Sequence, residues 1–337
     1  ITCAPSFYSS RFRNRASMRS WVALITCCSC LSAQPLVAPM HVMTAACSSP
    51  KFAANALALI RSIYESSTTR TGPVHVHVIH DDAKPIHEGL IRPLETLLAA
   101  GSLSERRLRA SFYVTAAQTV NTNNHIHRFA SCASTRLLIG RDFPQLDAVL
   151  YIDADVYVDG DLWEVWRLLA MYNRTQWLSL AQESETHTGW YARWPQHQAH
   201  AFEPNGLNSG VMLVNLTRWR ERDFTGFVLN YDWKAMPSEL PDQDLLNVYF
   251  RTRREEMYVL PCRWNMRTDS DCTVSEPGIW HGKADFFGNK LDGRINTSIS
   301  TRWEAVKHWL GHHSTEQDGS RRRGAHARNR TRGANAQ

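Results

Sequence analysis

The chain has 337 residues, of which 43% are hydrophobic and 10% aromatic, and its formal net charge is +6 at pH 7. This composition excludes a disordered or fibrous protein, and the length suffices for one large buried core. The positive charge is concentrated near the two ends, in RFRNRASMR and GSRRRGAHARNRTRG, and the body between them is slightly acidic. The sequence therefore gives little support for nucleic-acid binding, which needs a basic face on a folded domain.

Residues 1–38 have the layout of a secretory leader. Met18, Arg19 and Ser20 precede the apolar run WVALITCCSCL, and small and polar residues follow it. We favour a cleaved signal peptide, because this run of 11 residues is shorter than the ~20 that a spanning helix needs. A type II signal-anchor is the alternative. Both place the protein in the lumen of the ER or Golgi, with membrane attachment only through a retained anchor.

The body of the chain alternates between strand-like and helix-like patterns. We predict strands at 40–47, 72–80, 147–153, 177–181, 210–216 and 256–261, and helices at 50–67, 131–143, 161–172 and 242–250. Strands that alternate with helices predict an α/β fold with a mostly parallel sheet covered on both faces. The catalytic domain is predicted to span 39–312, and residues 313–337, which lack apolar residues, are predicted to be a disordered basic tail.

Cysteines and sequons bear on the compartment. Cys262 and Cys272 bracket the polar loop PCRWNMRTDSDC, and we predict that they pair in an oxidising lumen, with two free thiols as the alternative. N-x-[ST] sequons, which are acceptors for N-glycosylation, begin at Asn173, Asn215, Asn296 and Asn329. Together with the leader, these features point to the secretory pathway.

The stretch VLYIDADVYVDGDLW places acidic residues directly after an apolar strand. In open α/β sheets, ligands bind outside the carboxyl ends of the strands. Asp153 and Asp155 are two residues apart at such an end, so both carboxylates can converge on one hard divalent cation that also takes diphosphate oxygens. The alternative is that the two aspartates cap the next helix.

Several segments resemble glycosyltransferase family 8, and within it the glucoside xylosyltransferases. The resembling segments are MHVMTAAC, CASTRLLI, VLYIDADVYVDGDLWEVW, GWYARWPQH, GLNSGVMLVNLTR, DQDLLNVYF and LPCRWNMR. They occur in the family's order between about residues 40 and 312. The resemblance implies a GT-A fold, a UDP-sugar donor, a manganese-type cation and retention of configuration at the anomeric carbon.

The resemblance also implies a set of metal and donor residues. Asp153, Asp155 and His281 correspond to the metal ligands, although a lone histidine is more often an ordinary hydrogen-bonding residue. The residues that correspond to donor-binding positions are Ala45, Ala46, Cys47, Arg136, Ala154, Asn208, Ser209 and Lys283. From the residues alone, Arg136 could equally be a solvated surface charge and Asn208-Ser209 a plain turn. The family's Lys-Pro-Trp context after the histidine is absent here, and we choose Lys283 for the diphosphate because it is nearest to His281.

The segment DQDLLN carries the predicted catalytic residues Asp242, Gln243 and Asp244. In the family the middle glutamine lies beneath the anomeric carbon. An amide does not readily form the covalent intermediate of retaining glycosidases. The resemblance therefore implies front-face substitution, with Gln243 stabilising an oxocarbenium-like centre electrostatically. From the residues alone, the two acids would also suit the first turn of a helix as capping residues.

The acceptor prediction concerns the aromatic loop GWYARWPQHQAH. Trp190, Tyr191 and Trp194 could stack on sugar rings, and ordinary core packing is the alternative. By resemblance, the reaction transfers xylose from UDP-xylose to O-linked glucose on EGF-like repeats, such as those of Notch, in α-1,3 linkage.

Three other functions stay open at this stage. Another family 8 transferase would use UDP-glucose or UDP-galactose. The segment YIDADVYVD also fits the D-x-D-x-[TV] pattern of haloacid-dehalogenase phosphatases, in which the first aspartate is a nucleophile. A catalytically silent binding protein of the same fold is the third alternative.

Overall fold

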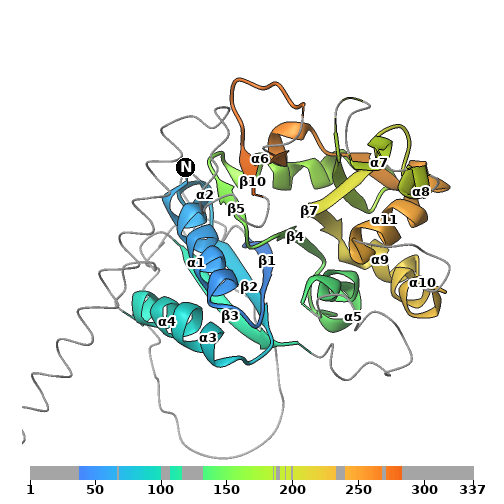
Figure 1. Ribbon diagram of the computed structural model, residues 1–337. Helices are drawn as coiled ribbons and strands as arrows, with labels where there is room; N and C mark the ends of the chain where they lie inside the picture. Colours follow the sequence, from blue (N-terminus) through green and yellow to red (C-terminus); the bar gives the residue numbers. More distant parts are fainter. Residues whose placement is uncertain are drawn as a thin grey trace, which may run out of the picture. The chain divides into compact units, whose positions relative to one another are not determined.

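Figure 1 presents a computed structural model of the protein. It describes residues 38–66, 68–99, 107–115, 132–184, 186, 190–193, 195–198, 200–232, 240–267 and 271–282. All of these belong to one compact unit. The predicted leader, apart from Ala38, and the predicted basic tail lie outside them. In this part of the chain, no helix combines the length and the apolar character that a bilayer crossing requires.

A seven-stranded sheet with the order β3-β2-β1-β4-β7-β6-β8 forms the centre of this unit. Its strands are β1 (Met40–Ala46), β2 (Val74–His80), β3 (Leu108–Val114), β4 (Ala148–Ile152), β6 (Leu178–Gln182), β7 (Leu207–Asn215) and β8 (Met257–Val259). Neighbouring strands are parallel except at β7, which is antiparallel to both β4 and β6. The predicted α/β fold with a mostly parallel sheet is confirmed, and β7 is its exception.

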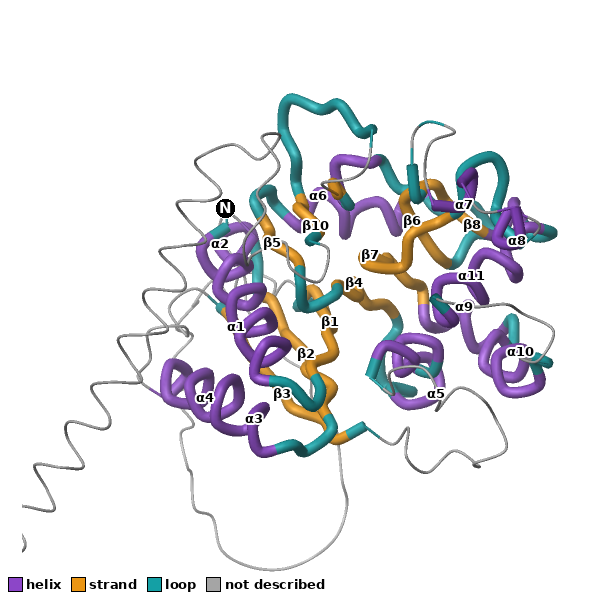
Figure 2. The backbone as a smooth tube through the Cα atoms, viewed as in Figure 1, coloured by secondary structure: helices purple, strands orange, loops and turns teal. Residues whose placement is uncertain are grey.

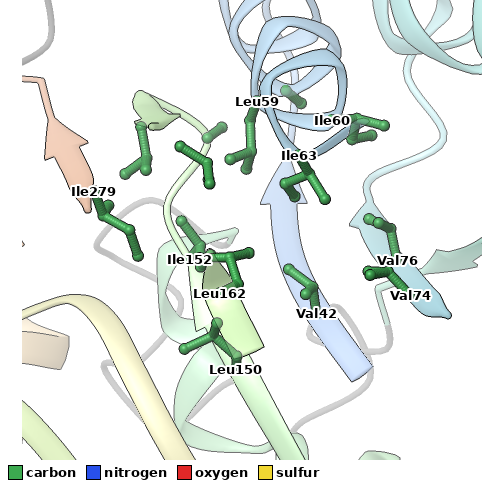
Figure 3. Close-up of a cluster of buried hydrophobic side chains, with 14 of the residues drawn as sticks. Val42, Leu59, Ile60, Ile63, Val74, Val76, Leu150, Ile152, Leu162 and Ile279 are labelled. Carbon is green, nitrogen blue, oxygen red and sulfur yellow. The ribbon is translucent and has the colours of Figure 1, made fainter. Parts of the chain in front are cut away.

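One face of the sheet is covered by α1 (Pro50–Glu65), which runs alongside β1 and β2 (Figures 1 and 2). Ser49 caps this helix by accepting a hydrogen bond from the backbone N–H of Lys51, and Pro50 occupies its first turn. Figure 3 shows Leu59, Ile60 and Ile63 directed at aliphatic side chains of the sheet. Each fully buried side chain of this kind contributes about 1.5–3 kcal/mol relative to exposure. Burial of its apolar side therefore holds α1 against this face of the sheet.

The opposite face carries an aromatic core. Trp177, Trp219 and Phe224 are each at most 1% exposed, and their rings are 4.6–5.4 Å apart. The covering helices are α5 (Ile139–Asp142), α9 (Leu216–Glu221), α10 (Phe224–Asn230) and α11 (Pro241–Arg251). This face brings the start of α11 against β7.

A small second sheet extends from the end of β4. It has the order β5-β10-β9, with β5 (Val156–Val158), β10 (Ile279–His281) and β9 (Met266–Arg267). β10 is antiparallel to β5, with His281 opposite Val156. Residues more than 120 positions apart in the chain are therefore neighbours at the end of β4.

Two predicted helices are broken in the structure. Residues 131–143 form a 3-10 helix η5 (Ala133–Leu137) followed by α5, and residues 161–172 form α6 (Leu162–Trp166) followed by a 3-10 helix η6 (Arg167–Met171). In the first case Arg136 is drawn toward Asp153, while Gly140 lies against Trp219. These tertiary contacts override the local helical pattern.

The remaining elements are short. They are α2 (Thr68–Thr71), α3 (Lys84–Ile86), the π-helical turn η1 (His87–Ile91), α4 (Arg92–Ala99), α7 (Trp190–Arg193), α8 (Pro195–Gln198), and the 3-10 turns η8 (Arg254–Glu256) and η9 (Cys262–Trp264).

The predicted disulfide between Cys262 and Cys272 is confirmed. A second disulfide joins Cys47, after β1, to Cys132, before η5, and the sequence analysis did not foresee it. It ties the end of β1 to the segment that carries Arg136.

Candidate active site

The candidate site lies at the carboxyl end of β4, where β7, β10 and α11 approach it (Figure 1). Asp153 follows the last residue of β4, and its backbone N–H donates to the carbonyl of Gly210 on β7 at 2.8 Å. The chain then turns through Ala154 and Asp155 into β5. The D-x-D motif is therefore a turn between the large and the small sheet, held from both sides.

Asp153, Asp155 and His281 form a carboxylate–histidine cluster. Each offers one ligand atom, and these atoms all lie within 4.8 Å of one another. The Nε2 atom of His281 is 3.8 Å from Asp153 Oδ2 and 3.6 Å from Asp155 Oδ1. The pairing of β10 with β5 brings His281 beside the motif. The two aspartates do not cap α6, because Asp161 does so by accepting from Trp163 N–H.

Hydrogen bonds fix the orientation of the His281 ring. The backbone N–H of Gly210 donates to Asn208 Oδ1, so the amide nitrogen of Asn265, 2.8 Å from the same oxygen, is also a donor. Asn265 Oδ1 then accepts from His281 Nδ1–H at 2.8 Å. This bond orients the ring so that Nε2 faces the two carboxylates, the position from which a deprotonated Nε2 can bind a metal.

The charges of the cluster are unequal. Burial raises the pKa of Asp153 against the effect of Arg136, and the nearby charge of Asp155 adds to the rise. Burial also opposes ionisation of Asp155, but the hydrogen bond and charge of His281 outweigh it and lower the pKa of that carboxyl. Two carboxylates this close repel each other, and a divalent cation would relieve that repulsion.

Arg136 lies at the centre of the site and is 5% exposed. Its guanidinium forms a two-pronged contact with Asp153, at 2.7 and 3.2 Å, and contacts Asp242 Oδ2 at 2.9 Å. It also donates to the carbonyl of Ser209 at 2.8 Å. Burial alone would lower the pKa of Arg136, but the two carboxylates raise it. The alternative that Arg136 is a surface charge is therefore wrong.

The three predicted catalytic residues open α11, and none of them caps it. The cap position is Leu240, whose side chain makes no capping bond. Asp242 instead faces Arg136. The side-chain oxygen of Gln243 accepts from Ser209 N–H at 3.1 Å, which leaves its amide nitrogen 3.2 Å from Glu183 Oε2. The bond to a backbone donor fixes both ends of the Gln243 amide.

Glu183 is a site residue that the sequence analysis missed. It follows β6, is 6% exposed, and accepts from the amide of Asn208 at 2.8 Å. Its carboxylate lies 2.8 Å from Arg267 Nη1. The available signals were its position two residues after the apolar segment WLSLA and the inclusion of Arg267 in the segment LPCRWNMR.

A buried polar network of Glu183, Tyr191, Gln243, Asp244 and Asn247 completes this half of the site. The Tyr191 hydroxyl donates to Asp244 Oδ1 at 2.8 Å and accepts from the Asn247 amide at 2.9 Å. Burial, reinforced by the charge of Asp244, raises the pKa of Tyr191 well above its ordinary value. The tyrosine is therefore a neutral hydrogen-bonding partner.

Tyr191 does not fit the predicted contact with an acceptor. It is 1% exposed, and its ring covers Gly206, where an added Cβ would lie 2.0 Å from a ring carbon. Its ring therefore has no free face, which corrects the prediction for this residue. The side chain of Trp190 and the whole of Trp194 lie outside the described residues.

The glycines beside Asn208 and Ser209 are explained by the protein's own side chains. Gly206 has a φ of +74°, which favours glycine. Gly210 lies against His281, and an added Cβ would be 2.0 Å from that ring. The structure shows Tyr191 and His281 at these positions.

The predicted donor positions near β1 are partly accessible. Ala46 is buried, Ala45 is half-buried, and Cys47 is 5% exposed and disulfide-bonded. Ala154, in the turn of the D-x-D motif, is buried. Lys283 lies outside the described residues.

The donor set of the carboxylate–histidine cluster fits a hard divalent cation. Two carboxylates, each 22% exposed, and the Nε2 of one imidazole converge, and such a mixed oxygen and nitrogen set suits manganese-type ions. Beside it lie Arg136, Asn208 and Ser209, which are residue types suited to phosphate and sugar hydroxyls, although Arg136 already donates to Asp153 and Asn208 to Glu183. The arrangement can bind a cation together with an anionic, hydroxyl-rich ligand.

Comparisons with known proteins agree with this geometry. The family model "Glycosyl transferase family 8" matches residues 43–312. Glucoside xylosyltransferase 1 of Mus musculus is 31% identical over 267 residues, which cover 74% of this chain and 63% of that protein. Glucoside xylosyltransferase 2 of Xenopus laevis is 36% identical over 183 residues, which cover 48% of this chain and 43% of that protein. The matches thus span about half of these relatives' length.

Solved structures share the fold. Mouse xyloside xylosyltransferase 1 superposes with a TM-score of 0.51 at 16% identity, over 74% of this chain and 99% of the other. The galactosyltransferase LgtC, in complex with donor and acceptor sugar analogues, superposes with a TM-score of 0.56 at 19% identity, over 81% of this chain and 95% of the other. The fold is therefore of the GT-A type found in nucleotide-sugar transferases.

Proposed function

The chain belongs to glycosyltransferase family 8, and from this membership we propose that it is a retaining, metal-dependent transferase that moves xylose from UDP-xylose to O-linked glucose on EGF-like repeats. The curated relatives supply the donor and acceptor classes of this proposal. The observation that carries its chemistry is the carboxylate–histidine cluster beside a buried Arg136 and a fixed Gln243 amide.

Asp153, Asp155 and His281 would hold the cation, for which we propose Mn²⁺. When bound, such an ion supplies a Lewis acid that offsets the charge developing on the departing diphosphate. Arg136 already has its guanidinium shared between Asp153 and Asp242. Its part is therefore to hold the two acids in place and to add positive charge near the phosphates.

The amide of Gln243 would lie on the sugar side of the site. Of its polar neighbours among the described residues, Glu183 faces Arg267, Asp242 faces Arg136, and Asp244 accepts from Tyr191. These partners leave the nearby carboxylates poorly suited to act as nucleophiles. This supports front-face substitution, in which Gln243 stabilises the oxocarbenium-like centre and the acceptor proton passes to a diphosphate oxygen.

A test of this role is Gln243→Ala, with Gln198→Ala on α8 as a control outside the network. We expect turnover to fall by roughly 10²-fold, the range for removal of one preorganised polar group, with the control unchanged. Full turnover by Gln243→Ala would remove Gln243 from the mechanism.

The donor sugar UDP-xylose has two specific rivals. UDP-glucose and UDP-galactose add a CH₂OH group to the ring of UDP-xylose, and family 8 membership is compatible with all three. The phosphatase alternative loses its support, because the chain belongs to a transferase family and Arg136 clamps the aspartate that would be its nucleophile.

We also propose a lumenal location and the domain bounds given above. The disulfides Cys47–Cys132 and Cys262–Cys272 suit an oxidising compartment. The leader would be residues 1–38, the catalytic domain 39–312 and the basic tail 313–337. Secretion or retention of an epitope-tagged full chain would separate a cleaved signal from a type II anchor.

The deciding experiment presents the purified chain with UDP-xylose, UDP-glucose or UDP-galactose and an O-glucosylated EGF repeat, with and without Mn²⁺. We expect xylose transfer with an α-configured product, identified by NMR of the new linkage. The unglucosylated repeat is the matched control. Transfer of a hexose in preference to xylose, or transfer to the unglucosylated repeat, would contradict the proposed specificity. Binding of UDP with no turnover on any acceptor would instead favour a silent binding protein.

A further inference from the structure

Three histidines on neighbouring strands form a second cluster on the large sheet. His41 lies on β1, and His75 and His77 lie on β2. Each offers one ring nitrogen, and these nitrogens lie within 4.8 Å of one another. His41 is the register partner of His75, and residues two apart on a strand point to the same face. The adjacency of β1 and β2 (Figure 2) thus brings all three rings together.

The hydrogen bonds of this histidine cluster suit a metal site. His41 Nδ1 and His77 Nε2 are 2.9 Å apart and share a proton. For tetrahedral coordination with Zn–N bonds of ~2.0–2.1 Å, ligand nitrogens lie roughly 3.3 Å apart. The nitrogens of His41 and His77 are 2.9 Å apart, and the three ligand nitrogens all lie within 4.8 Å of one another. The expected spacing falls inside this range.

Two hydroxyl groups on β3 contact the rings of His75 and His77. The other nitrogen of His77, Nδ1, is 3.1 Å from the Tyr113 hydroxyl, and His75 Nε2 is 2.8 Å from Ser111 Oγ. For His77, whose Nε2 faces His41, this is the kind of partner that metal-binding histidines commonly have on their second nitrogen. His77 is buried, whereas His41 and His75 are half-buried, so an ion can reach the cluster from solvent.

The cluster is a different place from the candidate active site. The pairing of Val42 with Leu150 aligns His41 with Val149, which lies four residues before Asp153. At ~3.3 Å per strand residue this is about 13 Å along the sheet. The donor chemistry also differs, because imidazole nitrogens prefer Zn²⁺, Cu²⁺ or Ni²⁺, whereas carboxylate-rich sites suit Mg²⁺ or Mn²⁺.

We propose that His41, His75 and His77 form a second metal site, which takes a borderline divalent cation of the Zn²⁺ class and joins β1 to β2. Three imidazoles fill three positions of a tetrahedral ion and leave the fourth for water. The site acts on the stability of the β1–β2–β3 part of the sheet and takes no part in sugar transfer. Burial lowers the pKa of His77 to about 3, so its ring is neutral at pH 7, the form that binds metals.

The test is a Co²⁺ titration of the full chain, purified without a histidine tag and followed by visible absorption. Tetrahedral Co²⁺ with nitrogen ligands absorbs strongly, whereas six-coordinate Co²⁺ among oxygens absorbs weakly. We expect a strong band at one equivalent, with affinity at least ~10-fold weaker in His75→Gln. The matched control is His200→Gln, which changes a half-buried histidine outside the cluster and should leave the band unchanged.

Two further variants separate this site from the other candidate clusters. The band should persist in Asp153→Asn, which changes the candidate active site, and in His87→Gln, which changes the group of His80, Asp82 and His87. Absence of the band, or its loss in either of these variants with retention in His75→Gln, overturns the proposal. Thermal melting without metal checks that His75→Gln folds, and His41→Gln replaces it if it does not. Zn²⁺ should raise the melting temperature of the wild type and not of the folded variant.

Discussion

The carboxylate–histidine cluster and the buried polar network are joined through Arg136 and Asn208, but their charges are balanced differently. Asp153 and Asp155 keep 22% of their side chains exposed, and the two carboxylates repel each other. In the network, Glu183, Gln243 and Asp244 are at most 6% exposed, and each has partners from the protein itself. The first half thus has a donor set suited to a cation, whereas the second is preorganised by folding. Changes in the first half should therefore alter ligand binding, and changes in the second should alter stability as well.

The largest effect is expected from Asp155→Asn. This change removes a charged ligand for the cation, and a bound metal contributes several kcal/mol to the transition state, so turnover should fall by at least ~10³-fold. The melting temperature should fall only moderately, because His281 stabilises the lost charge but that charge is partly exposed and lies beside Asp153. Asp159→Asn, just beyond β5, is the control and should keep nearly full turnover. If Asp155→Asn lost as much stability as a variant of the buried polar network, the two halves would not differ as described.

Glu183→Ala tests the other half. It leaves Arg267 buried without the carboxylate that lies 2.8 Å away, and breaking a buried pair of this kind costs about 3–5 kcal/mol. Chemical denaturation should show this loss in the free energy of unfolding, together with reduced turnover. Glu183→Gln keeps the shape of the side chain and one acceptor oxygen, so its free energy of unfolding should fall less than that of Glu183→Ala. Unchanged stability in Glu183→Ala would mean that the network is not built as described.

Asn265→Ala sharpens the comparison at the boundary between the halves. Asn265 accepts from His281 Nδ1–H and donates to Asn208, so its loss frees the His281 ring to turn. Removing such a partner weakens metal binding by about 10–100-fold. The Mn²⁺ concentration for half-maximal activity should rise by that factor, while turnover at saturating Mn²⁺ recovers. Asn205→Ala, which removes a buried asparagine that donates to Gln182, should not shift the metal requirement.

The smallest effect is expected from Tyr191→Phe. The change removes a hydroxyl that donates to the buried carboxylate of Asp244 and accepts from Asn247, and loss of a hydrogen bond to a charged group costs about 1.5–3 kcal/mol of stability. Thermal melting should show a loss of that size, and the KM for the acceptor should stay the same. A raised acceptor KM with unchanged stability would restore the interpretation that Tyr191 contacts the acceptor.

The sequence was sufficient for features that follow from local pattern. The strand before Asp153, the amphipathic α1 and the disulfide between Cys262 and Cys272 all follow from residue periodicity, capping residues or loop chemistry. The resemblance to family 8 also brought Arg136 and Gln243 into the predicted site, where the structure gathers them. Where these residues sit agrees with the predictions, while their roles in catalysis stay predictions.

Features that depend on distant contacts could not be predicted in this way. The antiparallel direction of β7 and the Cys47–Cys132 disulfide require knowledge of which segments pair. Glu183 was missed because its partners Asn208 and Arg267 lie far along the chain. Tyr191 was misjudged for the same reason, since an aromatic residue in a polar loop gives no sign that its hydroxyl is needed inside.

The most direct test of the central claim is the affinity of the full chain for UDP, measured by calorimetry with Mn²⁺ and again after thorough chelation. If Asp153, Asp155 and His281 hold a cation that also binds the nucleotide phosphates, chelation should weaken UDP binding at least ~10-fold, and Asp155→Asn should abolish the difference. Equal affinity for UDP with and without the cation would contradict the assignment of this cluster as the metal centre of the transferase.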